Sequence, residues 1–586
     1  MLKFWNNIDL KEKFNIIILF FSFFLIGFFD VLTISIIPIA LTYVISPEVF
    51  LSFLSNDSLR NFFINRFESL PIDLKIFYSS IIIISAFILK NLIVYGIYFN
   101  ESTYLKNLKL KLQYNVYTSY INKNYIDLFN FSQTEMLRDN ELCNNTTSYL
   151  RSWLIAFKEI IIICGLYLAI SINDKNIAYF ILIFFPFFIF IHFFLSARIK
   201  NWGNQITIYR KNTIDVIRET FDFFAEIKIF KKINIFSKRF LNETHNFEQR
   251  IYYQKLVTYF YKPFFEIVFI FFIFLIIFYF YKNQYTLNQI IPTISLIVFA
   301  FIRILPSISS LLVSINTIKF FEKSASLVLS KYKKLELKAL NYKSKKQHVG
   351  FDQEISIQKL KFKYKGSKNY LLKDISFKIN KNDKIAIIGK NGSGKTSLIN
   401  IISGLLQFDS GNIVVDSKLK FTSKDNFLWK DSGYFKQNSP ILQDSIKNNI
   451  ILFDNGSFKK NKFNQIMKLI DYKNNFSKRI LNEKFSYGGS KFSGGQRQII
   501  SLARTFYVNS ELNFLDEPTN NLDENAKKRV IEFISKNKNT FVIITHDIEV
   551  LKKCNKILIL ENGRIKNFIS TKKFLSNKKS LLSFLA

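Results

Sequence analysis

The sequence predicts an all-α polytopic membrane domain over residues 1–330, followed by an α/β domain over residues 355–586. Long apolar segments are concentrated in the first 320 residues. From Ile355 onward, short segments rich in β-branched residues alternate with segments of helical pattern. A Lys-rich, weakly patterned stretch, 331–354, joins the two and is expected to be a linker. With 586 residues the chain is too long for one compact core, so at least two domains are expected.

The membrane domain is predicted from apolar segments of sufficient length. A helix needs about 20 apolar residues to cross the hydrocarbon layer of a bilayer. Six segments meet that requirement, with soft edges: 14–45, 74–99, 152–171, 177–198, 262–282 and 287–318. The first segment is too long for a signal peptide and lacks a small-residue cleavage site, so we expect it to be the first membrane helix.

Basic residues predict the orientation of these helices. Lys and Arg gather in the long gaps 100–151 and 199–261 and near the amino terminus, and such loops face the cytoplasm. An even number of spans then places residues 355–586 in the cytoplasm. The long gaps carry amphipathic text, as in 206–230, and are expected to continue the membrane helices beyond the bilayer.

The net charge of +37 suggests a nucleic-acid partner, but the composition argues against one. The whole chain is rich in Lys, Asn, Ile and Phe, as an A/T-biased genome produces, and its Lys residues lie where cytoplasmic loops are expected. Cys143, Cys164 and Cys554 are scattered along the chain without paired spacing, so neither a disulfide framework nor a metal knuckle is predicted.

A phosphate-binding loop follows the predicted strand KIAII. Residues Gly389–Thr396 fit the pattern G-x-x-x-x-G-K-[ST]. They follow a predicted strand and precede a predicted helix, which is the context that this motif requires. Its glycines let backbone N–H groups close around phosphate oxygens. Lys395 is expected to neutralise the β- and γ-phosphates of ATP, and Thr396 to bind Mg²⁺. The predicted ATP contacts are Gly389, Lys390, Asn391, Gly392, Ser393, Gly394, Lys395, Thr396 and Ser397.

A second predicted strand, Leu512–Leu515, ends in two acids. Ligands bind at the carboxyl ends of strands in open α/β sheets. Beside a phosphate-binding loop, Asp516 is expected to hold Mg²⁺ and Glu517 to polarise the attacking water as a general base. A strand that ends in two acids without such a loop is more often the start of a solvated loop.

Five further elements, taken with these two, resemble the ATPases of the ABC family. Phe492–Gln496 is similar to their signature sequence, Asn521–Asp523 to their D-loop and Thr545–Asp547 to the segment that carries their switch histidine. Gln437 resembles the Q-loop glutamine, and Tyr364 the aromatic residue that stacks on adenine. The resemblance covers 355–586 and implies a P-loop NTPase domain of the ABC type. It implies that Glu517, His546 and Gln437 are catalytic, and that Gln437 also binds Mg²⁺ together with Thr396 and Asp516.

The resemblance implies a dimer. In ABC ATPases the signature caps the ATP that is held by the opposite subunit's phosphate-binding loop. Because this chain has one loop and one signature, a homodimer is the simplest expectation. The further residues expected to contact ATP are Ser493, Gly494, Gly495, Gln496 and Asp523.

Three positions depart from the family pattern. Tyr487 stands where exporters usually have an acidic residue, and Phe492 stands where Leu is usual in the signature. Asn513 is a polar residue inside a strand that is otherwise apolar, and the sequence offers no reason for it.

Six helices ahead of one cassette resemble the exporter class of ABC proteins, and within it the bacterial flippases of lipid-linked oligosaccharides. The matching text is VFAFIRILPSISSL, GGSKFSGGQ and the Lys-containing second and fifth helices. This resemblance implies export or flipping of an anionic lipid-linked glycan across the bacterial inner (plasma) membrane, with the cassette in the cytoplasm. The main alternative is an exporter of lipids or hydrophobic small molecules.

Three cations interrupt the predicted membrane helices. Lys90, Lys262 and Arg303 fall at a similar depth in the inner half of the bilayer, where a ring of cations suits a pyrophosphate headgroup. The alternatives are Lys side chains that reach for the interface and a pair between Arg303 and Glu266.

Other function classes fit less well. A peptide exporter is disfavoured because the sequence shows no amino-terminal peptidase domain with catalytic Cys and His. An ABC ATPase that acts on nucleic acid or ribosomes is disfavoured because such proteins lack the six apolar segments found here. A third function class, a channel that is gated by ATP, is also compatible with the sequence. Continuous ATP hydrolysis that is stimulated by substrate would distinguish a pump from such a channel.

Overall fold

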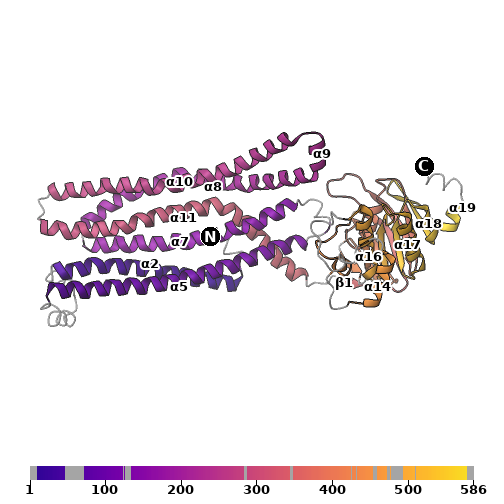
Figure 1. Cartoon of the computed structure of the whole chain (residues 1–586), viewed down its shortest axis with the longest axis horizontal. Helices are drawn as coiled ribbons and strands as arrows, with labels where there is room; N and C mark the ends of the chain where they lie inside the picture. The colour runs from indigo at the N-terminus through magenta and orange to yellow at the C-terminus, as the bar shows by residue number, and fades with distance from the viewer. Residues whose placement is uncertain are drawn as a thin grey trace. The chain divides into compact units, whose positions relative to one another are not determined.

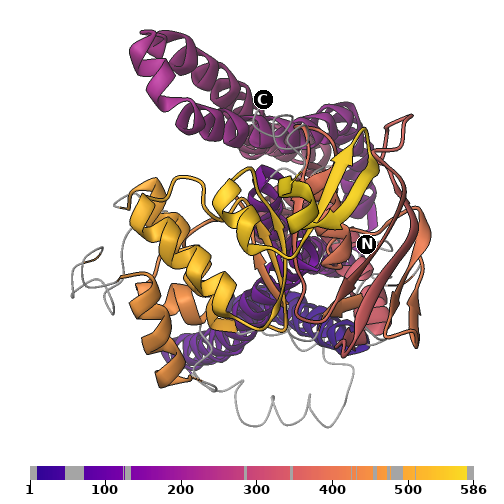
Figure 2. The ribbon, with the colours of Figure 1, turned by 90° about the vertical axis from the view of Figure 1, so that its right-hand side faces the viewer.

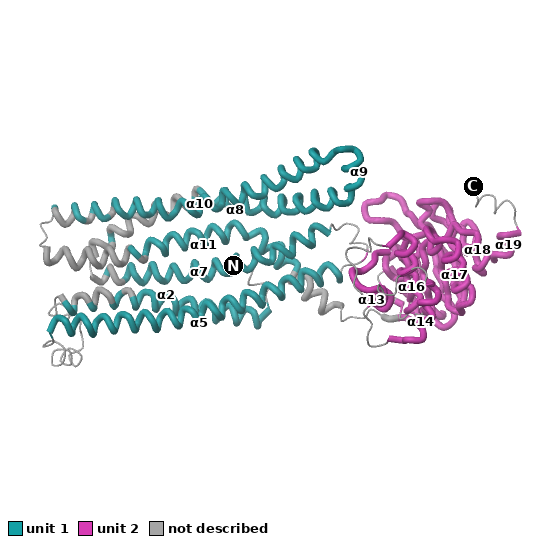
Figure 3. Tube along the Cα trace, viewed as in Figure 1, with its two compact units in different colours: residues 1–123, 131–341 teal, residues 124–130, 342–586 magenta. Residues whose placement is uncertain are grey.

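The structure is a computed structural model that describes most of the chain. The described residues are 9–45, 71–122, 125, 133–173, 175–282, 287–342, 347–423, 425, 427–429, 432–437, 439–452, 458–471, 476, 492–508 and 510–576. The chain divides into two compact units: Met1–Lys123 with Phe131–Asn341, and Asn124–Asn130 with Tyr342–Ala586 (Figure 3).

The described part of the first unit is helical, as predicted. Each predicted membrane segment falls within one long helix, and the amphipathic text after 206 continues helix α8 and forms the short helix α9. The helices are α2 Leu10–Ile45, α5 Ile72–Ile121, α7 Gln133–Asn173, α8 Lys175–Asp222, α9 Phe224–Ile229, α10 Ile233–Lys282 and α11 Leu287–Tyr342 (Figure 1).

Four helical stretches in the described part are long and apolar enough to cross a membrane. They are Leu10–Thr33, Ile72–Ile121, Ile233–Leu275 and Ile304–Lys331. Large apolar side chains such as Ile81, Leu92 and Phe274 are exposed on these helices, which is expected of surfaces that face lipid. The count of six spans remains a prediction.

The first unit is held together by close helix packing. Helix α2 packs against α5 and α7, and α8 runs beside α10 (Figure 1). A Cβ atom at Gly203 of α8 would lie 1.9 Å from the backbone oxygen of Phe320 in α11, so only glycine allows the two backbones to approach this closely. Helix α10 contains Pro263, which has no N–H to donate within the helix.

The second unit is built on a six-stranded sheet with the order β12-β11-β4-β10-β9-β8. Strands β11, β4, β10, β9 and β8 run parallel, and β12 pairs antiparallel with β11. All residues of β9 and β10 are buried, as expected when helices cover both faces of a parallel sheet. The bounds are β4 Lys384–Ile388, β8 Ser432–Phe435, β9 Leu512–Asp516, β10 Thr540–Ile544, β11 Lys556–Glu561 and β12 Arg564–Ser570.

An antiparallel sheet of four strands, in the order β3-β2-β5-β6, accompanies this central sheet. A third sheet pairs β1 in parallel with β7. The bounds are β1 Gln347–Val349, β2 Glu354–Phe362, β3 Leu372–Asn380, β5 Ser410–Val415, β6 Leu419–Phe421 and β7 Phe427–Trp429. The α/β class predicted for this part of the chain is confirmed.

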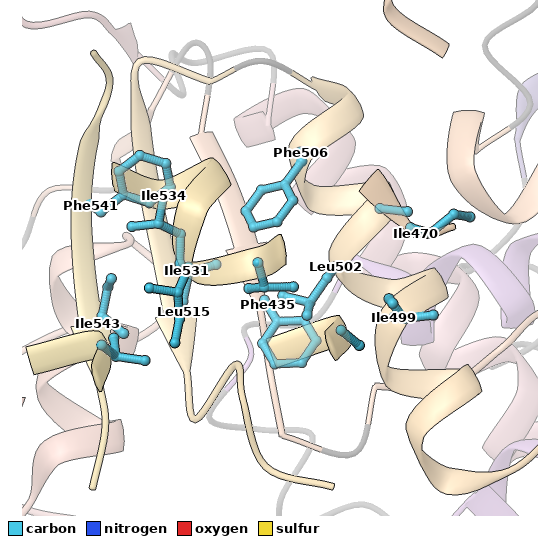
Figure 4. Packing of buried hydrophobic residues seen from close by; sticks show 14 of the residues in the cluster. Phe435, Ile470, Ile499, Leu502, Phe506, Leu515, Ile531, Ile534, Phe541 and Ile543 are labelled. Carbon is cyan, nitrogen blue, oxygen red and sulfur yellow. The ribbon is translucent and has the colours of Figure 1, made fainter. Parts of the chain in front are cut away.

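Helices pack on the central sheet through one of its two large apolar clusters. Ile499, Leu502 and Phe506 of helix α16 lie among strand residues such as Phe435 and Leu515 (Figure 4). Figure 2 turns these strands and helices toward the viewer. The bounds are α12 Lys395–Ile402, α13 Ile446–Ile451, α14 Lys460–Leu469, α16 Gly494–Val508, α17 Glu524–Lys536, α18 Ile548–Lys553 and α19 Thr571–Ser576.

The segment expected to be a linker has regular structure at both ends. Helix α11 continues to Tyr342, and β1 begins at Gln347. Because β1 pairs with β7, the chain is already part of the second unit before the predicted domain start at Ile355. Tyr125 also belongs to the second unit and packs against its core.

Candidate active site

The predicted phosphate-binding loop lies between β4 and α12. Gly389, Gly392 and Gly394 have φ values of 155°, 80° and 101°, which side-chain-bearing residues rarely adopt. A Cβ atom at Gly389 would also lie 2.2 Å from the backbone oxygen of Leu560. The glycines at the ends of the motif are therefore required by the backbone path of the loop.

Polar groups of this loop are suited to phosphate. The Ser393 hydroxyl is buried and has no hydrogen-bond partner among the described groups. Lys395 donates from Nζ to the backbone oxygens of Gly389 at 2.6 Å and Lys390 at 3.2 Å. Burial lowers the pKa of Lys395, while Glu517 and Asp516 act to raise it. A phosphate within the loop would give Ser393 an acceptor and Lys395 an anionic partner.

Thr396 and Asp516 form an oxygen pair suited to Mg²⁺. The Thr396 hydroxyl donates to Asp516 Oδ2 at 3.1 Å. Burial raises the pKa of Asp516, and the hydrogen bond from Thr396 opposes this shift. No group of three or more His, Cys, Asp or Glu side chains in the described part forms a metal cage. A hydroxyl and one carboxylate fit Mg²⁺, which usually completes its octahedron with water and substrate phosphates.

The three side chains predicted to be catalytic lie together. Gln437 donates from Nε2 to Glu517 Oε2 at 2.7 Å, and His546 Nε2 lies 4.0 Å from Glu517 Oε1. Asn520, which no sequence motif indicates as a site residue, also donates to Glu517 Oε2. Glu517 has a φ of 52°, an uncommon conformation for a residue with a side chain.

Tyr364 lies beside the loop as well. Its hydroxyl is 2.9 Å from Ser397 Oγ of α12, and its ring meets Phe362 edge-on at 4.9 Å. Tyr364 and Ser397, which are both predicted to contact ATP, are thus in contact with each other. Stacking of Tyr364 on adenine remains a prediction.

The signature segment begins helix α16 with a reciprocal cap. The Ser493 hydroxyl accepts from the Gln496 N–H at 3.1 Å, and Gln496 Oε1 accepts from the Ser493 N–H at 3.0 Å. A Cβ atom at Gly495 would lie 2.7 Å from the backbone oxygen of Asn521, so the helix start contacts the D-loop closely. Asp523 caps the next helix, α17, by accepting from the Ala526 N–H at 2.7 Å.

The structure explains two of the three departures from the family pattern. Phe492 is buried and meets Phe476 edge-on at 5.8 Å, so the larger ring fills an apolar space. Asn513 donates to the backbone oxygen of Ser510 at 2.8 Å and faces Gly433 on the neighbouring strand β8. Tyr487 lies outside the described residues.

The structure describes two of the three side chains of the predicted cation ring, and the ring remains a prediction. Lys90 Nζ lies 2.8 Å from Asp30 Oδ1, and both side chains are largely buried between α5 and α2. Lys262 is exposed on α10. Arg303 is part of α11, and its side chain lies outside what the structure describes. The ion pair with Asp30 was missed because sequence alone does not show which helices are neighbours.

Gln498 is another residue of the site that local sequence patterns do not reveal. Its Nε2 atom donates to the backbone oxygens of Glu517 at 3.3 Å and Pro518 at 2.9 Å. The only signal in the sequence is its place two residues after Gln496, on the same predicted helix.

Comparison with known proteins agrees with this geometry. A family model described as "ABC transporter" matches residues 372–520. The nisin transport ATP-binding protein NisT of Lactococcus lactis subsp. lactis is 32% identical over 235 residues, which are 38% of this chain and 38% of that protein. The ATP-dependent lipid A-core flippase of Wigglesworthia glossinidia brevipalpis is 32% identical over 218 residues, 36% of this chain and 37% of that protein.

A third relative is matched over nearly its whole length. The lipoprotein-releasing system ATP-binding protein LolD of Buchnera aphidicola subsp. Acyrthosiphon pisum is 34% identical over 212 residues, which are 34% of this chain and 90% of that protein. The matches to NisT and to the flippase, in contrast, span less than two-fifths of those proteins. From the phosphate-binding loop, the acid pair, the signature helix and these matches we conclude that the chain belongs to the ABC transporter family.

Proposed function

We propose that the chain is the subunit of a homodimeric exporter that couples ATP hydrolysis to the movement of an amphiphilic substrate across the bacterial inner membrane. The observation that carries this proposal is the position of Glu517. Its carboxylate accepts from Gln437, and it directly follows Asp516, which is bonded to the loop residue Thr396. Glu517 is therefore placed to accept a proton from a water that attacks the γ-phosphate.

The residues of this chain have separate roles in the reaction. The phosphate-binding loop and Lys395 hold the phosphates, Thr396 and Asp516 hold Mg²⁺, and Gln437 and His546 orient groups around Glu517. Mg²⁺, when bound, neutralises charge on the β- and γ-phosphates. The signature residue Ser493 completes the site of a second copy, which is why the proposal includes a homodimer with the cassettes in the cytoplasm.

The first candidate for the cargo is an anionic, lipid-linked oligosaccharide or a related glycolipid. Its support is the resemblance in the membrane helices and the relatives named lipid A-core flippase. The second candidate is a lipid or hydrophobic small molecule without a large anionic group. The pairing of Lys90 with Asp30 favours this candidate, because a neutralised cation offers less attraction to a phosphate.

Reconstitution into liposomes tests the proposal. Purified protein is expected to hydrolyse Mg-ATP and to move a fluorescent lipid-linked oligosaccharide or a fluorescent phospholipid only when ATP is present. Glu517→Gln is expected to lower the hydrolysis rate roughly 100-fold or more while ATP binding is retained. Glu532→Gln, at an exposed position of α17, is the matched control. Normal hydrolysis by Glu517→Gln would exclude its role as the base.

The two cargo candidates give different results with the cation variants. If the cargo is anionic, Arg303→Ala and Lys262→Ala slow transport of the lipid-linked oligosaccharide more than that of the phospholipid. If the cargo lacks a large anionic group, both variants transport at the wild-type rate. Equal rates would therefore remove the cation ring from the proposal and leave ATP-driven export in place.

A further inference from the structure

The turn that carries Glu517 is held by a side chain from the signature helix. Gln498 lies in the second turn of α16, and its carboxamide donates to two successive backbone oxygens, those of Glu517 and Pro518. The N–H of Glu517 donates to the backbone oxygen of Ile544 at 2.9 Å. The peptide groups on both sides of the Glu517 Cα are thus fixed, one by β10 and the other by α16.

This backbone needs such support. Glu517 has a φ of 52°, in the left-handed region that residues with a Cβ atom avoid. Such a conformation persists only when surrounding contacts hold it in place. If the turn relaxed, the Cα–Cβ bond of Glu517 would change direction, and its carboxylate would leave its position beside Gln437.

Helix α16 holds Gln498 in a fixed position, because the helix is packed tightly against the sheet. Ile499 and Leu502 are 3% and 1% exposed and lie in the cluster between α16 and the sheet (Figure 4). Buried residues of this kind fix the rotation of the helix about its axis, and this rotation turns Gln498 toward the catalytic turn. At the start of the same helix, Gly495 contacts Asn521 on the far side of the turn.

We propose that Gln498 is a positioning residue for Glu517, and that it links the two ATP sites of the dimer. This inference rests on the proposed function, because in a homodimer Ser493 and Glu517 of one chain serve different nucleotides. Gln498 is two residues beyond the signature and bonded to the turn that carries the base. A shift of α16 when the signature binds the partner's nucleotide therefore changes the position of the base that acts on the chain's own nucleotide.

The first test uses full-length protein in liposomes and separates kcat from KM. Gln498→Ala is expected to lower the kcat for ATP hydrolysis roughly tenfold or more, with the KM for ATP close to the wild-type value. Gln498→Glu keeps the shape but donates no hydrogen bond at neutral pH, and it is expected to be as slow. Gln498→Lys retains an N–H donor and is expected to recover part of the rate.

The matched control is Gln358→Ala, at an exposed position of β2 in the other sheet, and it is expected to keep the wild-type kcat. Wild-type kcat for Gln498→Glu would overturn the inference, as would a decrease that appears only in KM. Wild-type protein that fails to hydrolyse Mg-ATP would instead overturn the proposed function itself.

A second test uses mixed dimers and single-turnover hydrolysis, which needs only one competent site. One dimer carries Gln498→Ala and Glu517→Gln in the same chain, opposite a wild-type chain. The other carries Gln498→Ala in one chain and Glu517→Gln in its partner. The first is expected to hydrolyse at the rate of a dimer that carries Glu517→Gln alone, and the second at least several-fold more slowly.

The opposite pattern would mean that Gln498 acts through the signature on the partner's nucleotide, and equal rates would mean that it acts on neither. Either result would overturn the assignment of Gln498 to the base of its own chain.

Discussion

Asn513 shows how one residue depends on its neighbour across the sheet. It pairs with Gly433 in the parallel register of β9 and β8, and its side chain occupies space that a larger residue at 433 would fill. Its amide donates to the backbone oxygen of Ser510, which satisfies a buried acceptor near the start of the strand. A polar residue is therefore stable inside an apolar strand.

Gly433→Ala is expected to destabilise the second unit by roughly 1–3 kcal/mol, the range typical of overpacking. The added Cβ atom would lie 2.4 Å from Asn513 Oδ1 and 3.0 Å from Thr505 Cγ2. The measurement is the midpoint of thermal unfolding. Gly350→Ala, where an added Cβ meets nothing within 4 Å, is the matched control. Equal midpoints for the two variants would contradict this account.

Lys462 gives a prediction about pH. Burial lowers the pKa of Lys462 to about 8, and Lys459 adds to this shift. Between the folded pKa and the ordinary value of 10.5, the unfolded chain binds more protons than the folded one, so this group makes stability rise with pH across that window. Below pH 8 Lys462 is charged in both the folded and the unfolded chain, so the cost of its partial burial is fully present there.

Lys462→Met is expected to raise the unfolding midpoint at pH 7 by about 2 °C and to remove part of the rise between pH 8 and pH 10.5. Thermal scans at several pH values measure both effects. Lys460→Met, at an exposed position of the same helix, is expected to keep the wild-type profile. A midpoint that falls at pH 7 in Lys462→Met would show that the charge is stabilising instead.

At the scale of elements, a buried carboxylate joins three helices of the first unit. Asp139 of α7 accepts from the Tyr120 hydroxyl of α5 at 2.6 Å and from Arg138 at 2.8 Å, and it also pairs with Lys331 of α11. The Asp139 side chain is only 1% exposed. This cluster therefore ties α11 to α5 and α7 at Lys331.

Asp139→Ala is expected to destabilise the protein by roughly 3 kcal/mol, because it leaves two cations beside a buried cavity. Unfolding of the purified protein in detergent measures the loss. Asp222→Ala removes an exposed i,i+4 partner of Arg218 and is expected to cost less than about 0.5 kcal/mol. Similar losses for the two variants would mean that the cluster contributes no more than a surface pair.

The same scale shows what sequence could predict. The helices, the parallel sheet and the phosphate-binding loop follow from local patterns of apolar, β-branched and glycine residues, so the sequence predicts them. The pair of Lys90 with Asp30 and the contact of Gln498 with Glu517 join residues far apart in sequence. Nothing in a local pattern shows which helices are neighbours or which turn a helix side chain reaches, so neither contact follows from the sequence alone.

At the scale of the whole molecule, the proposed dimer makes a specific prediction about complementation. A mixed dimer with Lys395→Ala in one chain and Ser493→Ala in the other damages a single composite site, so the second site stays intact. A dimer with both substitutions in one chain, opposite a wild-type chain, damages both sites. Single-turnover hydrolysis is expected to be retained in the first dimer and lost in the second. The reverse result would mean that each signature serves its own chain's nucleotide.

The proline in α10 affects how such a molecule can bend. Helix α10 has 50 residues, which corresponds to about 75 Å at 1.5 Å per residue. A helix of this length can transmit a displacement along its axis, but it bends where its backbone hydrogen bonds are interrupted. Pro263 interrupts these hydrogen bonds next to the largely apolar stretch Phe264–Phe280, so the residues of α10 before Pro263 can change direction relative to that stretch.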